Sequence, residues 1–261
     1  MLNKNNKFIL VSERRNKIID KLTIEKQVLV NELSEEFDVS EVTIRNDLAY
    51  LEKKGILLRT HGGAIKQRKV ALEYDLTEKQ KQNLPQKQRI GKKAVELIQD
   101  NDTILLDSGS TTIEVAKNLI NFNHLTVITN ALNIISQLKD YHNINLIVPG
   151  GILKPEALAF HGGPAEDSFK NYYCDKFFLG VDAIDITHGI STPTIEEAHL
   201  NKVMIKISNQ VILVADSSKF GKKNLAFIAP VNIIHTIITD TGLPEEMKNS
   251  YENLGITVIT A

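Results

Sequence analysis

Residues 30–51 read VNELSEEFDVSEVTIRNDLAYL and predict two short helices separated by a tight turn. Apolar side chains recur three and four residues apart on both sides of the turn, as one buried face per helix requires: Val30, Leu33 and Phe37, then Ile44, Leu48 and Leu51. Ser40 is a good N-cap for the second helix, because its hydroxyl can accept a free amide of the first turn. The pattern favours a helix-turn-helix, whose second helix can enter a DNA major groove.

The outward face of the second predicted helix carries side chains that can read base pairs. Asn46 can pair bidentately with adenine, Val42 can contact a thymine methyl group, and Arg45 can contact guanine or phosphate. We expect Ile56–Arg59 to form a strand and His61–Ala64 a turn, which together make a wing near the phosphate backbone. The predicted DNA-contacting residues are Ser40, Val42, Thr43, Arg45, Asn46, Tyr50, Arg59 and His61. A helical hairpin with an ordinary solvated face, followed by a simple connecting hairpin, is the alternative interpretation.

The composition is typical of a soluble globular protein. The 261 residues are 42% hydrophobic, and no apolar run approaches the length that a membrane span needs. The N-terminus lacks a signal-peptide core, and the single Cys174 excludes an intrachain disulfide, so we expect a cytoplasmic protein without a membrane partner. The seven histidines and this cysteine show no metal-ligand spacing, so we expect no metal site and no cofactor.

Charge divides the chain into unequal parts. Residues 1–70 carry a net charge of +4 and residues 71–261 a net charge of −5, which suits a basic end for polyanions. We expect a winged helix-turn-helix domain over residues 1–66, a polar and partly helical linker over residues 67–88, and a larger domain over residues 89–261.

Short apolar runs alternate with amphipathic segments in the larger predicted domain. The runs are Thr103–Leu106, Leu125–Ile128, Ile144–Val148, Lys176–Leu179, Val211–Val214, Thr236–Ile238 and Ile256–Ile259. The amphipathic segments are Gln86–Gln99, Thr111–Ile120, Leu132–Leu138, Glu196–Ile207 and Pro244–Leu254. Strands that alternate with helices predict an α/β fold with a parallel sheet covered on both faces.

Small and polar residues follow several of these predicted strands, where ligands of open α/β sheets bind. The strongest candidate is Asp107–Thr112, DSGSTT, which links a predicted strand to a predicted helix and offers several hydroxyls and one glycine. Helix N-terminal amides favour a phosphate, but the chain has no Walker lysine here and no G-x-G-x-x-G pattern, which disfavours a nucleoside triphosphate or a dinucleotide. A small monophosphate fits better, and a well-capped helix without a ligand is the alternative.

No catalytic arrangement can be assigned from the sequence. Acidic and basic side chains could support proton transfer if they met at one substrate, and ordinary surface charge is the other explanation for most of them. They are Asp107, Asp182, Glu196, Glu197, Lys202 and Lys219. No Ser/His/Asp set stands out, so we name no catalytic residue.

Several motifs in both predicted domains resemble the DeoR family of bacterial transcriptional repressors. In the N-terminal part they are Ser12–Arg15, Val39-Ser40, Thr43–Arg45, Asp47-Leu48 and His61–Ala64. In the C-terminal part they are Asp107–Thr112, Thr129-Asn130, Gly150-Gly151 and Asp216–Phe220. Thr43–Asp47 and Phe178–Asp185, with Asn201 downstream, are similar to the branch of this family that controls N-acetylgalactosamine and galactosamine utilisation.

The resemblance implies a winged helix-turn-helix joined to a sensor domain that is similar to ribose-5-phosphate isomerase and to amino-sugar-phosphate deaminases. Such a sensor binds a phosphorylated sugar, here possibly an amino-sugar 6-phosphate, and acts as a switch rather than as an enzyme. Carried over by motif, the effector-binding residues would be Asp107, Ser108, Gly109, Ser110, Thr111, Thr112, Thr129, Asn130, Gly150, Gly151, Asp182, Glu197 and Lys219.

Three departures separate this chain from the patterns that it resembles. Asn46 stands where most of the family has a second arginine, so the operator sequence does not carry over. His61 replaces the tyrosine that the galactosamine branch favours, and Thr192–Ile195 differs from that branch near the expected sugar pocket. The last two departures leave the exact sugar open.

We therefore expect a repressor of a carbohydrate-utilisation operon that binds operator double-stranded DNA as a dimer or tetramer and is released by its effector. Two alternatives remain open from the sequence. One is a sugar-phosphate isomerase or deaminase with an accessory DNA-binding domain, and the other is a DNA-binding protein whose large domain only oligomerises.

Overall fold

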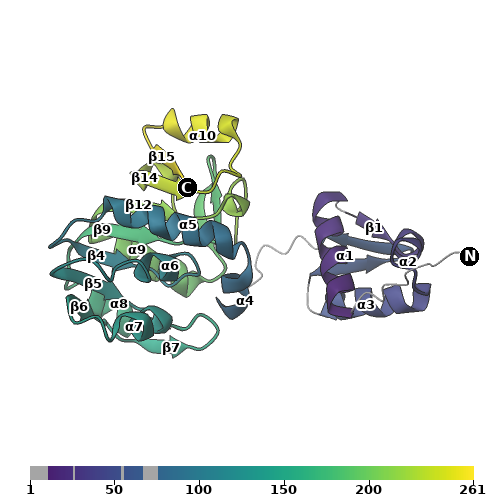
Figure 1. Cartoon of the computed structure of the whole chain (residues 1–261), viewed down its shortest axis with the longest axis horizontal. Coiled ribbons are helices and arrows are strands. Elements are labelled where there is room, and N and C mark those ends of the chain that lie inside the picture. Colours follow the sequence, from purple (N-terminus) through teal and green to yellow (C-terminus); the bar gives the residue numbers. More distant parts are fainter. Residues whose placement is uncertain (1–10, 26, 54–55, 67–75) are drawn as a thin grey trace, which may run out of the picture. The chain divides into compact units, whose positions relative to one another are not determined.

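The computed structural model divides the chain into two units, residues 1–72 and residues 73–261 (Figure 1). It describes residues 11–25, 27–53, 56–66 and 76–261. Among these described residues, every helix is too short or too polar to cross a membrane.

The N-terminal unit is a winged helix-turn-helix, as predicted. Its helices are α1 (Val11–Glu25), α2 (Val30–Phe37) and α3 (Glu41–Lys53), and its strands are β1 (Gln27–Leu29), β2 (Leu57–Thr60) and β3 (Gly63–Lys66). The apolar faces of the helices enclose one core that includes Leu33, Ile44 and Leu48. Asp38 ends α2 in the left-handed conformation at φ 51°, and this conformation turns the chain toward α3.

The wing differs from the sequence prediction. The predicted turn at His61–Ala64 is confined to His61 and Gly62, and β3 begins at Gly63 and pairs with both β1 and β2. A Cβ at position 63 would lie 2.0 Å from the carbonyl oxygen of Val28, so this close approach of β1 requires glycine. The three residues of β1 are too few to give a readable alternation in the sequence.

The C-terminal unit is built on seven parallel strands in the order β15-β14-β12-β9-β4-β5-β6. The strands are β4 (Thr103–Leu106), β5 (Leu125–Thr129), β6 (Ile144–Ile147), β9 (Cys174–Leu179), β12 (Ser208–Val214), β14 (Thr236–Thr239) and β15 (Thr257–Thr260). Each of the seven predicted apolar runs falls on one of these strands. The predicted parallel α/β fold is therefore confirmed.

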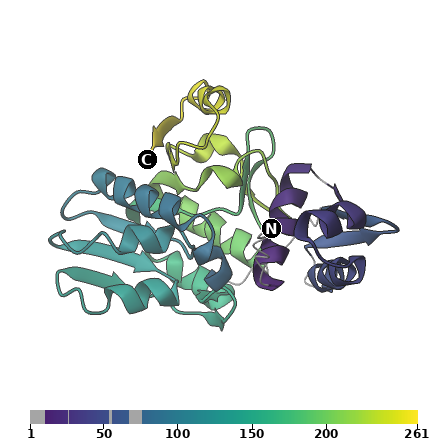
Figure 2. The same cartoon turned by 45° about the vertical axis from the view of Figure 1, so that its right-hand side comes forward.

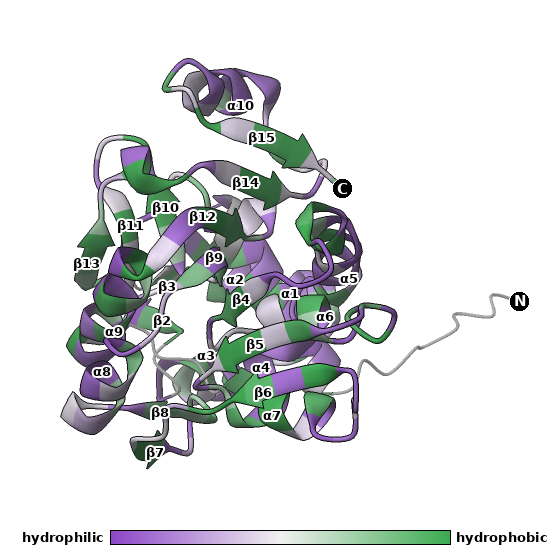
Figure 3. Ribbon diagram, turned by 90° about the vertical axis from the view of Figure 1, so that its left-hand side faces the viewer, coloured by the Kyte–Doolittle hydropathy of each residue, from purple (hydrophilic) through white to green (hydrophobic). Residues whose placement is uncertain are grey.

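Helices cover both faces of this sheet, which Figures 1 and 2 show from two directions. One apolar core lies under α5 (Leu84–Ala94), α6 (Thr112–Ala116) and α7 (Leu132–Leu138). The other lies under α8 (Gly163–Phe169), α9 (Ile195–Lys206) and α10 (Glu245–Glu252). Phe177 and Phe178 are both fully buried and belong to opposite cores, because neighbouring strand residues point to opposite faces. In Figure 3 the strands are largely green, as expected for a sheet buried on both sides.

Smaller elements complete the C-terminal unit. β7 (Ile152–Lys154) and β8 (Ala159–His161) form a hairpin, and β10 (Ala183–Asp185), β11 (Gly189–Thr192) and β13 (Ala226–Ala229) form an antiparallel sheet. None of these strands was predicted from the sequence.

The predicted linker has more structure than its polar composition indicates. Residues 67–75 lie outside the described residues, whereas the rest of the segment contains α4 (Leu76–Lys81) and the start of α5. Pro85 lies in the first turn of α5, a position that tolerates its missing N–H.

Candidate functional site

The outer surface of α3 presents the residues that were predicted to contact DNA. Val42, Arg45 and Asn46 are exposed, whereas Ile44 and Leu48 are buried beneath them. Of the other predicted residues, Ser40, Tyr50, Arg59 and His61 are exposed and Thr43 is half-buried. The amide of Thr43 donates a hydrogen bond to Ser40 Oγ at 3.2 Å, which is the N-cap contact that the sequence predicts.

Two arginines of this surface are held by acidic partners on α3. Arg45 Nη2 lies 2.7 Å from Glu41 Oε2 one turn away, and Arg59 donates its backbone amide to Glu52 Oε1 at 2.9 Å. The pair of Arg45 and Glu41 is exposed, where an ion pair contributes little to stability. A phosphate or a base edge can therefore replace Glu41 as the partner of Arg45 at small cost.

Asp47 is a buried residue of α3 that sequence reasoning did not assign to any role. Only 1% of its surface is exposed, and its two carboxylate oxygens accept hydrogen bonds from Arg14 Nε at 2.6 Å and Arg15 Nε at 2.7 Å. Arg15 also stacks on the ring of Tyr50 at 3.8 Å. These contacts fix α1 against α3, so Asp47 positions α3 without belonging to its exposed face.

The C-terminal unit has a topological switch point between β4 and β9. From β4 the chain continues outward through β5 and β6, and it then returns to place β9 on the other side of β4. Ligands of such sheets bind beyond the carboxyl ends of the two strands at this point. The loops that begin at Asp107 and Gly180 meet there, since a Cβ on Gly180 would lie 3.8 Å from Asp107 Oδ2.

Asp107 is buried at this switch point with an unsatisfied oxygen. Oδ1 accepts the Ser108 amide at 2.7 Å, whereas Oδ2 has no hydrogen-bond partner among the described residues. Burial raises the pKa of Asp107 well above its ordinary value, and the nearby charges of Glu197 and Asp182 act in the same direction. The protonated carboxyl that these conditions favour can donate a hydrogen bond to a ligand oxygen.

The loop after β4 is shaped by its own threonine. Thr112 is buried and donates its hydroxyl to the carbonyl oxygen of Asp107 at 2.7 Å. The hydroxyls of Ser108 and Ser110 make no hydrogen bond within the described part of the chain, and both residues are half-buried. The predicted helix Thr111–Ile120 is shortened to five residues in α6, so its dipole is small and offers little attraction for an anion.

Other predicted effector residues have structural roles. Thr129 donates its hydroxyl to the Leu106 carbonyl at 2.8 Å and so joins β5 to β4. Gly150 and Gly151 have positive φ angles, and a Cβ on Gly151 would lie 2.8 Å from the Ala165 side chain. The close packing of Gly151 against α8 is therefore sufficient to explain why this residue is glycine.

Asn130 and His161 are buried side chains with unsatisfied atoms. Asn130 donates Nδ2 to the Phe160 carbonyl at 2.9 Å, but its Oδ1 has no partner among the described residues. Both ring nitrogens of His161 are also without a partner in this part of the chain, and burial together with Lys154 lowers its pKa to about 4. His161 is therefore neutral near pH 7 and offers one donor and one acceptor.

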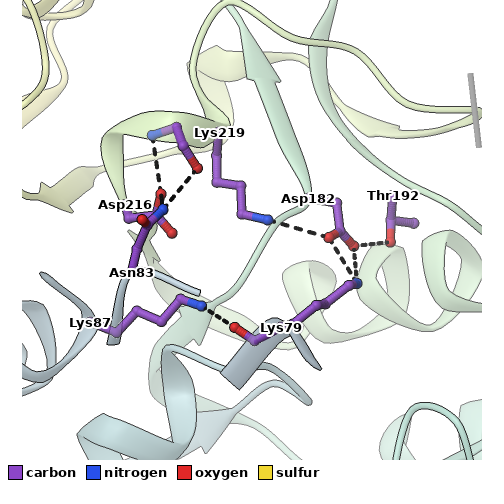
Figure 4. Close-up of polar contacts among 8 residues, drawn as sticks. Lys79, Asn83, Lys87, Asp182, Thr192, Asp216 and Lys219 are labelled. Atoms are coloured by element: carbon purple, nitrogen blue, oxygen red, sulfur yellow. Dashed lines mark hydrogen bonds and ion pairs between the residues drawn. The ribbon is translucent and has the colours of Figure 1, made fainter. Parts of the chain in front are cut away.

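Asp182 is the centre of a charged cluster just after β9 (Figure 4). Its carboxylate lies 2.8 Å from Lys79 Nζ and 3.6 Å from Lys219 Nζ, and Thr192 donates its hydroxyl at 3.5 Å. Burial alone would raise the pKa of Asp182, but the two ammonium groups outweigh it and lower that pKa. Asp182 is thus a charged, paired carboxylate.

Lys87 and Asn83 extend the cluster from the side of α5, and sequence reasoning missed both. Lys87 is only 2% exposed and donates Nζ to the Lys79 carbonyl, while Asn83 donates Nδ2 to Asp216 Oδ1 at 2.9 Å. Their only sequence signal is the spacing of positions 79, 83 and 87, which places three polar side chains four residues apart inside a presumed linker. The cluster holds three lysines and two aspartates, an excess of one positive charge.

We expect Lys87→Met to stabilise the ligand-free protein at pH 7. Burial lowers the pKa of Lys87 from 10.5 to about 8. The charge of Asp216 raises this pKa, whereas the charges of Lys219 and Lys79 lower it further. The net pKa shift corresponds to about 3 kcal/mol. Between these two pH values the folded wild type binds fewer protons than the unfolded chain, so its stability rises with pH, whereas methionine does not titrate. Denaturant unfolding should therefore show a gain at pH 7 that shrinks toward pH 10.5. A gain of equal size at both pH values would contradict this reasoning.

Among the described residues, no group of three or more histidine, cysteine or acidic side chains could hold a metal ion. The site therefore consists of hydroxyls, carboxyls and ammonium groups at the ends of β4, β9 and β12. Such a set can bind an anion through lysines and hydroxyls, and it can bind hydrogen-bond donors or a cationic group through its carboxyls.

Two domain families match this chain. The family described as DeoR C terminal sensor domain matches residues 82–241, and the family described as DeoR-like helix-turn-helix domain matches residues 14–70. The two matches fall on the two units of the structure.

Full-length relatives match as well. A protein of Escherichia coli O157:H7 named "Putative aga operon transcriptional repressor" is 40% identical over 250 residues, which are 95% of this chain and 93% of that protein. An uncharacterized HTH-type transcriptional regulator of Bacillus subtilis (strain 168) is 37% identical over 250 residues, which are 96% of each chain. Among solved structures, ribose 5-phosphate isomerase A from Methanocaldococcus jannaschii aligns with 53% of this chain and 55% of its own, at 20% identity and a TM-score of 0.39.

Proposed function

The chain belongs to the DeoR family of transcriptional regulators, and from this premise we propose that its C-terminal unit binds a phosphorylated amino sugar and thereby releases operator DNA from its N-terminal unit. The ligand acts by binding one conformation more tightly than the other. A coupling free energy of about 1–3 kcal/mol would change operator affinity several-fold to a hundredfold.

The observation that carries this proposal is the mixture of charges at the ends of β4 and β9. Lys87 and Lys219 supply ammonium groups for a phosphate, and the buried carboxyl of Asp107 interacts with the charges of Glu197 and Asp182. A phosphate alone offers no donor to Asp107 Oδ2, which has no hydrogen-bond partner among the described residues. A ligand that carries both a phosphate and an amino group can satisfy both kinds of side chain.

The similarity of Thr43–Asp47 and Phe178–Asp185 to the galactosamine branch of the family supports the same choice. An amino-sugar 6-phosphate is therefore the first class of effector to test. We propose the residues Asp107, Ser108, Ser110, Asp182, Glu197 and Lys219 from the predicted set as its contacts, with Lys87 added from the structure.

Operator recognition is assigned to the exposed face of α3. A single helix-turn-helix reads few base pairs, so we propose that the repressor binds two half-sites as a dimer or tetramer. Light scattering on the free protein and on its operator complex measures this state. A monomer in both samples would contradict it.

We expect Asn46→Ala to weaken specific operator binding by about 1–3 kcal/mol, because a bidentate contact to adenine is lost. Asn46 is exposed on α3, so the substitution leaves the core unchanged. Fluorescence anisotropy with operator and with random DNA of the same length separates the two kinds of binding. An equal loss on random DNA would remove Asn46 from base reading.

The experiment that tests the effector is a titration of the repressor on DNA from upstream of its own gene. Galactosamine 6-phosphate, glucosamine 6-phosphate, galactose 6-phosphate and inorganic phosphate are compared, and the amino-sugar phosphates should release DNA at the lowest concentrations. A bound effector at a hundred times its Kd should also stabilise the protein by about 2.7 kcal/mol in thermal unfolding.

Other outcomes of this titration identify other functions. Rapid turnover of a sugar phosphate would show an isomerase or deaminase instead of a switch. Unchanged unfolding temperatures with all four compounds at millimolar concentration would favour a domain that only oligomerises.

A further inference from the structure

Helix α4 cannot be stable by itself. It has six residues, and Leu76 is its only buried side chain, whereas an isolated helix in water needs about 12–15 residues to form. It is also the first described element after residues 67–75, through which the chain continues from the N-terminal unit. What holds α4 in place therefore decides where the sensor unit ends and where the connecting segment begins.

Polar contacts help to hold α4 on the C-terminal unit. Lys79 pairs with Asp182, the backbone amide of Leu76 donates to the Glu156 carbonyl at 3.0 Å, and the Lys79 carbonyl accepts Lys87 Nζ. Lys79 takes part in two of the three contacts (Figure 4). Its side chain forms the ion pair with Asp182, and its backbone carbonyl makes the contact with Lys87 of α5.

The partner of Lys79 belongs to the proposed effector site. Asp182 follows β9 at the switch point, and its carboxylate is shared between Lys79 of α4 and Lys219 beyond β12. Asp182 has two oxygens and already contacts two ammonium groups and the Thr192 hydroxyl. A ligand ammonium or hydroxyl that binds Asp182 must compete with Lys79. A ligand phosphate that pairs with Lys219 would weaken the contact between Lys219 and Asp182.

We propose that the Lys79–Asp182 ion pair is a latch, which fastens α4 to the sensor unit in the ligand-free repressor and opens when the ligand engages Asp182. This inference rests on the proposed function for its ligand. Opening releases α4 from the sensor unit, so that α5 becomes the first described element that the sensor unit holds. In the closed state the operator-binding unit is tethered at Leu76, and in the open state the first contacts of the sensor unit are those of α5.

The latch is tested in the full-length protein without any ligand by Lys79→Met. Amide exchange measured by mass spectrometry should become faster in residues 76–83 of this variant. Its operator affinity should fall several-fold to a hundredfold, toward that of the wild type saturated with galactosamine 6-phosphate. Lys81→Met is the matched control, because Lys81 lies on the same helix and, within the described part of the chain, its ion pair is with the exposed Glu78 at 2.9 Å. It should behave like the wild type in both measurements.

Lys79→Arg shows whether an effect of Lys79→Met comes from the lost ion pair or from a damaged fold. Arginine keeps the positive charge, so it should restore slow exchange and operator affinity if the ion pair is the cause. Wild-type exchange and wild-type operator affinity in Lys79→Met would overturn the latch. Faster exchange with unchanged operator affinity would also overturn it, because α4 would then be held without being coupled to DNA binding.

The same exchange measurement with added ligand tests the latch separately from the proposed function. Galactosamine 6-phosphate should accelerate exchange in residues 76–83 of the wild type, and inorganic phosphate alone should do so less. If the sugar phosphate binds and releases DNA while this segment stays protected, the latch is wrong and the proposed function stands. If no compound binds but Lys79→Met loosens α4 and weakens operator binding, the effector assignment is wrong while the attachment of α4 remains supported.

Discussion

We expect Asp47→Ala to unfold the N-terminal unit or bring it to the edge of unfolding, while the seven-stranded sheet stays folded. The substitution leaves Arg14, which is 6% exposed, without a partner for its buried charge. Removing one partner of a buried ion pair costs about 3–5 kcal/mol. A unit of about 70 residues has little more than this to lose. Specific operator binding should disappear with the fold.

Calorimetry of the full-length protein measures this effect, since the two units should give separate transitions. Glu36→Ala is the matched control in the same unit, because it removes the exposed partner of Lys21, whose contribution to stability should be below about 1 kcal/mol. If Asp47→Ala and Glu36→Ala melt at the same temperature, the buried pair does not hold α1 against α3.

Ser110→Leu should produce a repressor that binds its operator normally and no longer responds to its effector. Ser110 is half-buried in the loop between β4 and α6, where its hydroxyl has no hydrogen-bond partner within the described residues. The larger leucine side chain would occupy the space that a phosphate needs and would add no polar group. Operator titrations with and without galactosamine 6-phosphate measure the response.

Ser110→Ala is the control for this loop, because it removes the hydroxyl without adding bulk. The loss of one hydrogen bond to a charged group should weaken effector affinity by about 1.5–3 kcal/mol and leave the maximal response intact. An undiminished response in Ser110→Leu would place the phosphate elsewhere. Replacement of Thr111 is less informative, since this residue is buried and a larger side chain would disturb the fold.

The local elements of this protein are readable because each has a strong periodic signal. The three- and four-residue spacing at Val30, Leu33 and Phe37 and the cap at Ser40 lie within one or two turns of helix, so no distant contact is needed to detect them. The seven apolar runs are equally clear, since a strand buried on both faces is continuously hydrophobic. β1 and the hairpin of β7 and β8 were missed because three residues carry no period.

The candidate site is only partly readable. Asp107 and its neighbours were found because ligands of α/β sheets bind after the strands, and the structure places this loop at the switch point. Thr129 and Gly151 were included by motif, and the structure gives each a structural reason for its identity. Lys79 and Lys87 were missed because their segment has the polar composition of a linker.

The sequence by itself determined two domains, a helix-turn-helix with the exposed face of its second helix, and a parallel α/β sheet, because all of these follow from periodicity and capping over short distances. The tertiary structure alone decided which charges meet. Arg14 reaches Asp47 across 33 positions, and Lys79 reaches Asp182 across 103. Such pairs depend on how the helices pack and on the insertion of β9 beside β4. A buried charge leaves no periodic pattern in the sequence from which its partner could be predicted.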